Sequence, residues 1–170
     1  MTVASGSGNV IKLKGLDTFV KAAGYHPQTR FLVVGLTQEG KKDLRLCFDS
    51  DNVQICDRAS QAELIGCHQR AKVYCQLSNR ESFGVALAEA MESGCVPEVT
   101  NRGALSEVVG ITGCLVPCND PISTANAIEK ALSSEKVGDA RKRIRSIFRK
   151  ELREANMIDS LKNLVGASRK

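Results

Sequence analysis

The stretch Ala71-Lys-Val-Tyr-Cys-Gln-Leu-Ser-Asn-Arg-Glu-Ser-Phe-Gly-Val-Ala-Leu-Ala-Glu-Ala-Met-Glu-Ser-Gly94 passes from an apolar run through a polar loop into a helical pattern. Residues 71–76 are typical of a buried strand, because apolar side chains dominate the run and a polar loop ends it. A helix is expected to begin at about Phe83-Gly84, where free backbone N–H groups and the helix dipole would form an anion site. Gly84 would let an anion approach the backbone closely.

The same alternation of short apolar runs and helical patterns extends along most of the chain. Strands are expected at 31–35, 52–56, 71–76, 95–100 and 114–117, and helices at 16–23, 41–48, 61–69, 83–93 and 122–132. Short connections between such elements predict βαβ units, and therefore a parallel sheet covered on both faces. We expect one Rossmann-like α/β domain over residues 1–138, with a mostly parallel sheet of about six strands. Ligands bind such sheets at the carboxyl ends of the strands.

Composition excludes several classes of protein. The 170 residues are 42% hydrophobic and 25% charged, which is too apolar for a disordered chain. No apolar run approaches the length of a membrane-spanning helix, and the first eight residues lack the features of a secretory signal. Seven cysteines without a C-x-x-C pair argue against a disulfide framework or a zinc site, so we expect reduced, buried cysteines and a cytoplasmic protein.

The net charge of +5 comes from the end of the chain. Residues 139–170 carry ten Lys and Arg against four Asp and Glu, whereas residues 1–138 are close to neutral. This distribution does not resemble the basic face of a nucleic-acid binder. Apolar residues recur at helical spacing from 144 to 165, which predicts basic amphipathic helices that pack on the same domain.

Two carboxylates near the expected helix start are candidates for binding hydroxyl groups. Glu81 would precede the helix and Glu89 would lie on its second turn, so both could face one crevice. Carboxylates accept hydrogen bonds from the hydroxyls of a sugar or a ribose. In the alternative interpretation Glu81 is a helix cap, and Glu89 and Glu92 are solvated helix residues.

These residues belong to a wider pattern that resembles the donor-binding C-terminal domain of retaining glycosyltransferases with the GT-B fold, family 4 type. The resemblance covers nearly the whole chain. Its segments, in order, are Lys14-Gly-Leu-Asp17, Leu32-Val-Val-Gly35, Asn52-Val53, Ser60-x-x-Glu63-Leu64, Glu81-x7-Glu89 with Phe83-Gly84 inside it, Gly94-Cys-Val-Pro97, Thr100-Asn-Arg-Gly103 to Val109, and Gly113-Cys-Leu-Val116.

The resemblance implies a site for a nucleotide sugar. Lys14 and the amides of Gly84 and Val85 would hold the donor diphosphate, and Lys14 with Glu81 would be the catalytic residues. Glu81 would contact the donor sugar, and Glu89 the ribose. The remaining donor-binding candidates are Phe83 and Arg58, the latter in the loop with Asp57 that lies near the base. Solvated surface side chains are the alternative for Lys14, Arg58 and Arg80.

The implied chemistry is transfer of a hexosyl group with retention of configuration, from a UDP- or GDP-linked donor to a glycan, lipid or small-molecule acceptor. A lysine and a helix N-terminus stabilise the departing diphosphate electrostatically, so no metal and no further cofactor is expected. Related sugar-nucleotide 2-epimerases share the fold but fit the motifs less well.

Three departures from the family pattern bear on function. Gly8 stands where the family has a second diphosphate-binding arginine. Lys72 and Glu98 replace residues that are usually acidic and apolar, and we expect them to pair across neighbouring strands. Finally, only one of the two GT-B domains is present.

The missing acceptor domain would lie in the same polypeptide or in a partner chain. Without it we expect the chain alone to have little or no activity. The chain is interpreted as an excised domain or as a natural subunit. The alternative function is a non-catalytic nucleotide-sugar-binding or assembly module.

The basic tail has three interpretations. Its helix would expose an apolar face that crosses to the other domain, or lie on an anionic membrane as a peripheral contact. In the third interpretation it is a solvated basic face, packed on the core by Ile144, Ile147 and Phe148. The basic residues concerned are Arg141, Lys142, Arg143, Arg145, Arg149 and Lys150.

Overall fold

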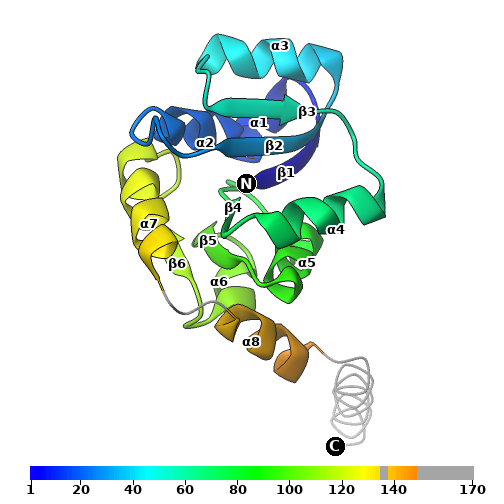
Figure 1. Ribbon diagram of the computed structural model, residues 1–170, viewed down its shortest axis with the longest axis vertical. Helices are drawn as coiled ribbons and strands as arrows, with labels where there is room; N and C mark the ends of the chain where they lie inside the picture. The colour runs from blue at the N-terminus through cyan, green and yellow to red at the C-terminus, as the bar shows by residue number, and fades with distance from the viewer. Residues whose placement is uncertain (135–137, 149–170) are drawn as a thin grey trace, which may run out of the picture.

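The computed structural model describes residues 1–134 and 138–148, and its strands and helices alternate along the chain (Figure 1). The elements are β1 (Thr2–Gly6), α1 (Asn9–Leu13), α2 (Leu16–Ala23), β2 (Phe31–Leu36), α3 (Gln38–Cys47), β3 (Val53–Cys56), α4 (Gln61–Arg70), β4 (Val73–Gln76), α5 (Val85–Ser93), β5 (Val96–Thr100), α6 (Leu105–Val109), β6 (Cys114–Val116), α7 (Pro121–Ser133) and α8 (Asp139–Ile147). Every strand pair is parallel.

The strands form two three-stranded sheets that meet at Met1. Their orders are β1-β2-β3 and β4-β5-β6. The Met1 ammonium donates a hydrogen bond to the Val73 carbonyl at 2.7 Å, and the Cys75 N–H donates to the Met1 carbonyl at 2.8 Å. These bonds place β1 beside β4, so the strands run in the order 3-2-1-4-5-6 of a doubly wound sheet. The predicted Rossmann-like α/β fold is confirmed.

Helices cover both faces of the strands, as expected. One core cluster joins side chains of α1, α2, α3 and α7 to the first face, including Phe19, Val33 and Ile128. The other cluster joins α4, α5, α6 and α8 to the opposite face, including Tyr74 and Leu87. Successive strand residues point to opposite faces of the sheet. Because helices bury both faces, residues of both sets are apolar and the runs show no alternating pattern.

Local capping sets the starts of three helices. The predicted cap of α7 is confirmed, because the Ser123 N–H donates to the Asp120 carboxylate at 2.9 Å. Thr37 caps α3, and Ser60 with Glu63 forms a capping box at α4. The five-residue helices α1 and α6 were not predicted, because they are too short to show a helical period.

Two glycines bring backbone against backbone around the loop that follows β4. A Cβ on Gly15 would overlap the Leu77 carbonyl, and a Cβ on Gly103 would overlap the Glu81 carbonyl oxygen. Both residues also have a positive φ, at 65° and 59°. The loop between β4 and α5 is therefore held between the α1–α2 turn and the β5–α6 turn, and this contact fixes where Glu81 lies.

Helix α8 packs on α5 and α6 through apolar and polar contacts. Ala140 and Ile144 are buried in the core, whereas Ile147 is 41% exposed. Arg141 donates to the Glu92 carbonyl and Arg143 to the Val108 carbonyl, while Arg145 pairs with the Glu92 carboxylate at 2.6 Å. These three arginines therefore bind protein groups. Arg149 and Lys150, which were also named as basic residues of the tail, lie outside the described residues, as do all of residues 149–170.

The expected ion pair between Lys72 and Glu98 is absent. The Lys72 ammonium instead donates to the Leu132 carbonyl at 2.6 Å, at the end of α7. The backbone explains the error: Lys72 precedes β4 and its ammonium reaches the end of α7, whereas Glu98 lies within β5, opposite Cys75. Glu98 is fully buried, and neither carboxylate oxygen has a hydrogen-bond partner among the described residues.

Two further sequence expectations concern cysteines and membranes. All seven cysteines are free thiols, but only Cys75 and Cys95 are buried, and the other five are half-buried. Burial raises the pKa of the Cys95 thiol to about 11. Within residues 1–134 and 138–148, no helix is both long and apolar enough to cross a membrane.

Replacing Glu98 by Gln should remove a pH-dependent loss of stability. Burial raises the pKa of Glu98 from 4.5 to about 8, opposed in part by the Met1 ammonium. Between these values the unfolded chain releases a proton that the folded chain keeps, so folding stability falls as pH rises. We expect the free energy of unfolding of Glu98→Gln, relative to the unsubstituted protein, to rise by about 3 to 4 kcal/mol from pH 5 to pH 8.

Urea unfolding at several pH values measures this difference. Glu129→Gln, which removes an exposed carboxylate from α7, is the matched control and should leave the pH dependence unchanged. A difference that stays constant from pH 5 to pH 8 for Glu98→Gln would show that the buried carboxyl is already ionised in the folded chain.

Adding one methyl group at Gly103 should destabilise the protein more than the same change at Gly8. Both glycines have a φ near +60°, but a Cβ at Gly8 meets no atom within 4 Å, whereas a Cβ at Gly103 overlaps the Glu81 carbonyl. Backbone strain alone should cost Gly8→Ala about 1 to 3 kcal/mol. Gly103→Ala should cost at least about 2 kcal/mol more, because the loop must also move. Equal losses in urea unfolding would contradict the close contact.

Candidate functional site

Lys14 and Glu81, which are 67 residues apart in sequence, form an ion pair at the carboxyl ends of the strands. The distance from Lys14 Nζ to Glu81 Oε2 is 2.7 Å. Both side chains are largely buried, with exposed fractions of 29% and 14%. The structure thus brings together the two residues that the sequence analysis named as catalytic candidates.

A chain of hydrogen bonds leads from the core to the same carboxylate. The Tyr74 hydroxyl donates to Gln76 Oε1 at 2.9 Å, and Gln76 Nε2 donates to the Ser78 hydroxyl at 3.0 Å and to Glu81 Oε2 at 3.2 Å. Ser78 Oγ is a further donor, 3.4 Å from Glu81 Oε2. Glu81 Oε2 therefore faces three donors, which fix the orientation of the carboxylate.

Asn79 holds the segment that carries Lys14. Its backbone N–H donates to the Leu13 carbonyl at 2.8 Å, and its side-chain amide donates to the Lys12 carbonyl at 2.7 Å. These two carbonyls lie at the end of α1, immediately before Lys14. The sequence analysis missed Gln76, Ser78 and Asn79, because amides and hydroxyls at the end of a strand are common in turns and give no specific signal.

Helix α5 begins beside this pair with free backbone donors. Gly84 is its N-cap residue with a φ of 80°, and no side chain caps the helix. The first hydrogen bond of the helix runs from the Ala88 N–H to the Gly84 carbonyl, so the N–H groups of residues 85–87 have no partner within the helix. No acidic residue stands in the first turn, so the positive end of the helix dipole is not neutralised there.

Glu89 lies at a different place from the Glu81 cluster. Its Oε1 accepts a hydrogen bond at 3.0 Å from Gln61 of α4. It also lines a pocket of about 510 Å³ between α4, α5 and α8, with Glu92 and Arg145. The expectation that Glu81 and Glu89 share a crevice is supported by no contact between them in the described part of the chain.

Arg58 and Asp57 lie in the β3–α4 loop beside another pocket. This pocket of about 650 Å³ is lined by both residues, by Val34 of β2 and by the adjacent side of α4. The Asp57 carboxylate is held by Lys41 at 2.8 Å and by the Gln38 amide at 3.0 Å. Arg58 is exposed. The loop thus offers a positioned carboxylate and a solvated guanidinium next to a cavity.

Phe83 packs toward α8. Its ring meets the ring of Phe148 edge-on, with centroids 5.1 Å apart. Val85, two residues after Phe83, is 65% exposed at the start of α5. Phe83 therefore stabilises the approach to α5, and its contact with a donor stays a prediction.

Gly8 has an acidic neighbourhood. Its N–H donates to the Asp43 carboxylate at 2.9 Å, and the preceding Ser7 hydroxyl donates to Glu39 at 3.1 Å. Gly8 itself has a φ of 57° at the start of α1. No group of three His, Cys, Asp or Glu side chains in residues 1–134 and 138–148 could hold a metal ion.

Curated relatives of this chain are glycosyltransferases. It is 31% identical over 137 residues to D-inositol 3-phosphate glycosyltransferase of Paenarthrobacter aurescens, a match that covers 72% of this chain and 33% of that protein. Over 90 residues it is 31% identical to GDP-mannose:cellobiosyl-diphosphopolyprenol alpha-mannosyltransferase of Xanthomonas campestris, covering 50% and 24%. The matches thus span about a third or less of these relatives.

Solved structures share the fold. Sucrose-phosphate synthase of Thermosynechococcus elongatus superposes with a TM-score of 0.77 at 26% identity, covering 98% of this chain and 46% of that one. The C-terminal domain of the glycosyl transferase group 1 family protein LpcC of Francisella tularensis superposes with a TM-score of 0.68 at 21% identity, covering 88% and 84%.

The family assignment follows from the sequence itself. The family model for glycosyl transferases group 1 matches residues 4–151, which is most of the chain. The matched segment contains the Lys14–Glu81 pair, the start of α5 and the strands between them. The chain belongs to the glycosyl transferases group 1 family and carries the Rossmann-like fold of the C-terminal domain of its GT-B members.

Proposed function

We propose that this chain is the nucleotide-sugar-binding half of a retaining glycosyltransferase of the family 4 type. In the reaction the bond between the sugar and the diphosphate breaks, and the sugar passes to a hydroxyl of the acceptor, which loses its proton. The diphosphate leaves with additional negative charge. The demand on this domain is to bind the donor and stabilise that charge.

The ion pair of Lys14 and Glu81 beside the free N-terminus of α5 carries the proposal. A diphosphate at this helix end would accept hydrogen bonds from the N–H groups of residues 84 and 85 and would lie within the positive field of α5. Lys14 would supply a full positive charge, and Glu81 would accept hydrogen bonds from sugar hydroxyls. In the free protein these two side chains bind each other, so a donor must share or replace that contact.

Glu89 and the Asp57–Arg58 loop are proposed to bind the nucleoside. A ribose that reached the groove between α4 and α5 would offer hydroxyl donors to Glu89, whose partner Gln61 is also a polar side chain. The base would lie toward the β3–α4 loop. A similar structure, Anabaena Alr3699/HepE, was solved with UDP, and curated relatives are named for GDP-mannose, so a UDP- or GDP-linked hexose is the proposed donor.

Turnover is proposed to need a second domain. The chain spans about a third or less of the curated relatives it matches. An acceptor domain, in the same polypeptide or in a partner chain, would complete the cleft, bind the acceptor and exclude water. The chain alone should therefore bind donor and transfer little or no sugar.

A non-catalytic binding or assembly module is the second candidate, and Gly8 favours it. The position where the resemblance implies a second cation carries no side chain and lies among Asp43 and Glu39. Loss of one phosphate-binding cation weakens stabilisation of the leaving group. The fold and the donor site would then persist without full activity.

Calorimetric titration with UDP, GDP and ADP tests the donor site. We expect saturable binding of one nucleotide, with Lys14→Ala weakening it about tenfold to a hundredfold, because a charge-assisted hydrogen bond to the diphosphate is lost. Glu89→Ala should also lower the affinity for that nucleotide. Lys130→Ala, which removes an exposed cation from α7, is the charge-matched control. A folded chain that binds none of the nucleotides would contradict an intact donor site.

Glu81→Gln should separate the two roles of that carboxylate. The substitution removes the negative charge that competes with the diphosphate for Lys14, so we expect the free nucleotide to bind several-fold more tightly. The matching nucleotide sugar should lose its advantage over the free nucleotide, because the sugar loses its strongest hydrogen-bond acceptor. If Glu81→Gln lowered the affinities for the free nucleotide and for the nucleotide sugar equally, the carboxylate would serve to hold the site together. The proposed contact with the sugar would then be wrong.

A further inference from the structure

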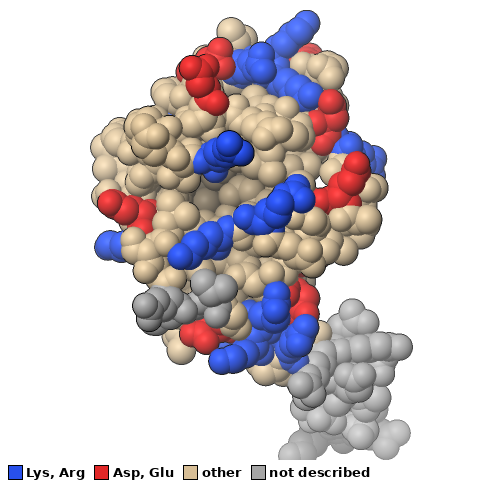
Figure 2. Space-filling view, viewed as in Figure 1, with Lys and Arg blue, Asp and Glu red and all other residues tan. Residues whose placement is uncertain are grey.

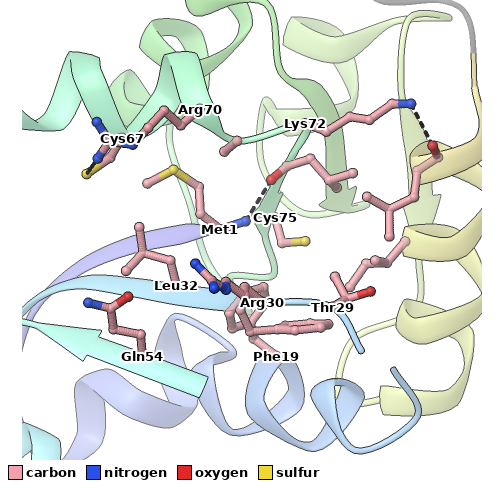
Figure 3. A pocket seen from close by; sticks show the side chains of 15 residues that line it. Met1, Phe19, Thr29, Arg30, Leu32, Gln54, Cys67, Arg70, Lys72 and Cys75 are labelled. Atoms are coloured by element: carbon pink, nitrogen blue, oxygen red, sulfur yellow. Dashed lines mark hydrogen bonds between the residues drawn. The ribbon is translucent and has the colours of Figure 1, made fainter. Parts of the chain in front are cut away.

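A separate pocket lies at the amino ends of the strands, on the edge of the sheet opposite Lys14 and Glu81. It has a volume of about 450 Å³ and is lined by residues at or near the starts of β1, β2 and β4, among them Met1, Arg30 and Lys72 (Figure 3). Drug-sized ligands occupy pockets of roughly 300 to 1,000 Å³. The size therefore suits a small molecule, and the position keeps it away from the proposed donor site.

The inner wall of this pocket is apolar. Phe19 and Phe31 are almost fully buried there, and their rings lie 5.1 Å apart. Ile128 and Leu132 of α7 and Leu32 of β2 complete the apolar wall. An apolar cavity of about 150 Å³ is enough for one benzene molecule. The space here suits a short alkyl chain or a fused ring system.

The rim of the pocket is cationic. Arg30, Arg70 and Lys72 line it and are all exposed, whereas none of the residues that line it is acidic. Lys and Arg side chains surround a hollow in the middle of this face, where the N-terminus lies (Figure 2). Lys72 donates to the Leu132 carbonyl and Arg70 to the Cys67 sulfur, and within residues 1–134 and 138–148 neither forms an ion pair with a carboxylate.

The cations come from both halves of the sheet. Arg30 precedes β2, whereas Arg70 is the last residue of α4 and Lys72 precedes β4. Hydrogen bonds of the Met1 backbone connect the halves here. A bound anion would relieve repulsion between the cations and link the halves, so its binding should also raise the thermal stability of the fold.

We propose that this pocket binds an amphiphilic anion, with the apolar body against Phe19, Phe31 and Ile128 and the acidic head between Arg30 and Arg70. An uncharged amphiphile would contact only the apolar wall, and a free inorganic anion would bind only the cations of the rim. No residue of the Lys14–Glu81 cluster lines this pocket, which shares only Cys67 and Arg70 with the pocket beside the β3–α4 loop.

Calorimetry and thermal unfolding with decyl phosphate, kept below its micellar concentration, test the inference. We expect saturable binding, a raised melting temperature, and an affinity at least tenfold above that of decanol or inorganic phosphate. The double variant Arg30→Gln/Arg70→Gln should lower the affinity at least tenfold. Lys42→Gln, which removes an exposed cation of α3, is the control and should have no effect. Circular dichroism verifies that each variant is folded.

Three results would overturn the proposal. Decanol binding as tightly as decyl phosphate would show that the cations do not contribute. Inorganic phosphate binding as tightly would show that the apolar wall does not contribute. Loss of decyl phosphate binding in Lys14→Ala would place the anion at the carboxyl edge instead. Failure of nucleotide binding would leave this experiment unaffected, since its readouts require no nucleotide.

Discussion

The close contact of two turns with the loop after β4 is the constraint on which the candidate site depends. Gly15 lies against the Leu77 carbonyl and Gly103 against the Glu81 carbonyl, so the loop is fixed from two sides. Asn79 completes the arrangement by hydrogen-bonding the end of α1. Because of these contacts, Lys14 lies together with Glu81 and the start of α5 although they come from two separate segments of the chain.

The carboxylate of Glu81 has competing uses within that frame. It accepts hydrogen bonds from Lys14, Gln76 and Ser78 in the free protein, and these partners keep a largely buried negative charge stable. The same charge reduces the attraction of Lys14 for an anion. If Lys14 turned to another partner, Gln76 and Ser78 would still be within hydrogen-bond distance of the Glu81 carboxylate.

The sequence predicted the fold well because most strands are short apolar runs and the longer helices between them have a helical pattern, with a clear start at Asp120. It also predicted Lys14 and Glu81 as partners in one site, through the resemblance and not through spacing. It did not predict the Gln76–Ser78 chain, whose residue types are unremarkable in a turn. It was wrong about Lys72 and Glu98, because the sequence does not show that Lys72 precedes β4 and that its ammonium reaches the end of α7.

Gly8 limits where a second cation for a diphosphate could come from. A residue with a Cβ would be strained at its φ of 57°, and the Gly8 N–H already binds Asp43. An arginine placed there would also lie beside the carboxylates of Asp43 and Glu39 and would tend to pair with them. Under the proposed function, a diphosphate at α5 would therefore depend on Lys14 and on the helix N–H groups. The other cation of this segment is Lys12 in the last turn of α1, whose exposed side chain would have to reach the phosphates to take the place of the missing arginine.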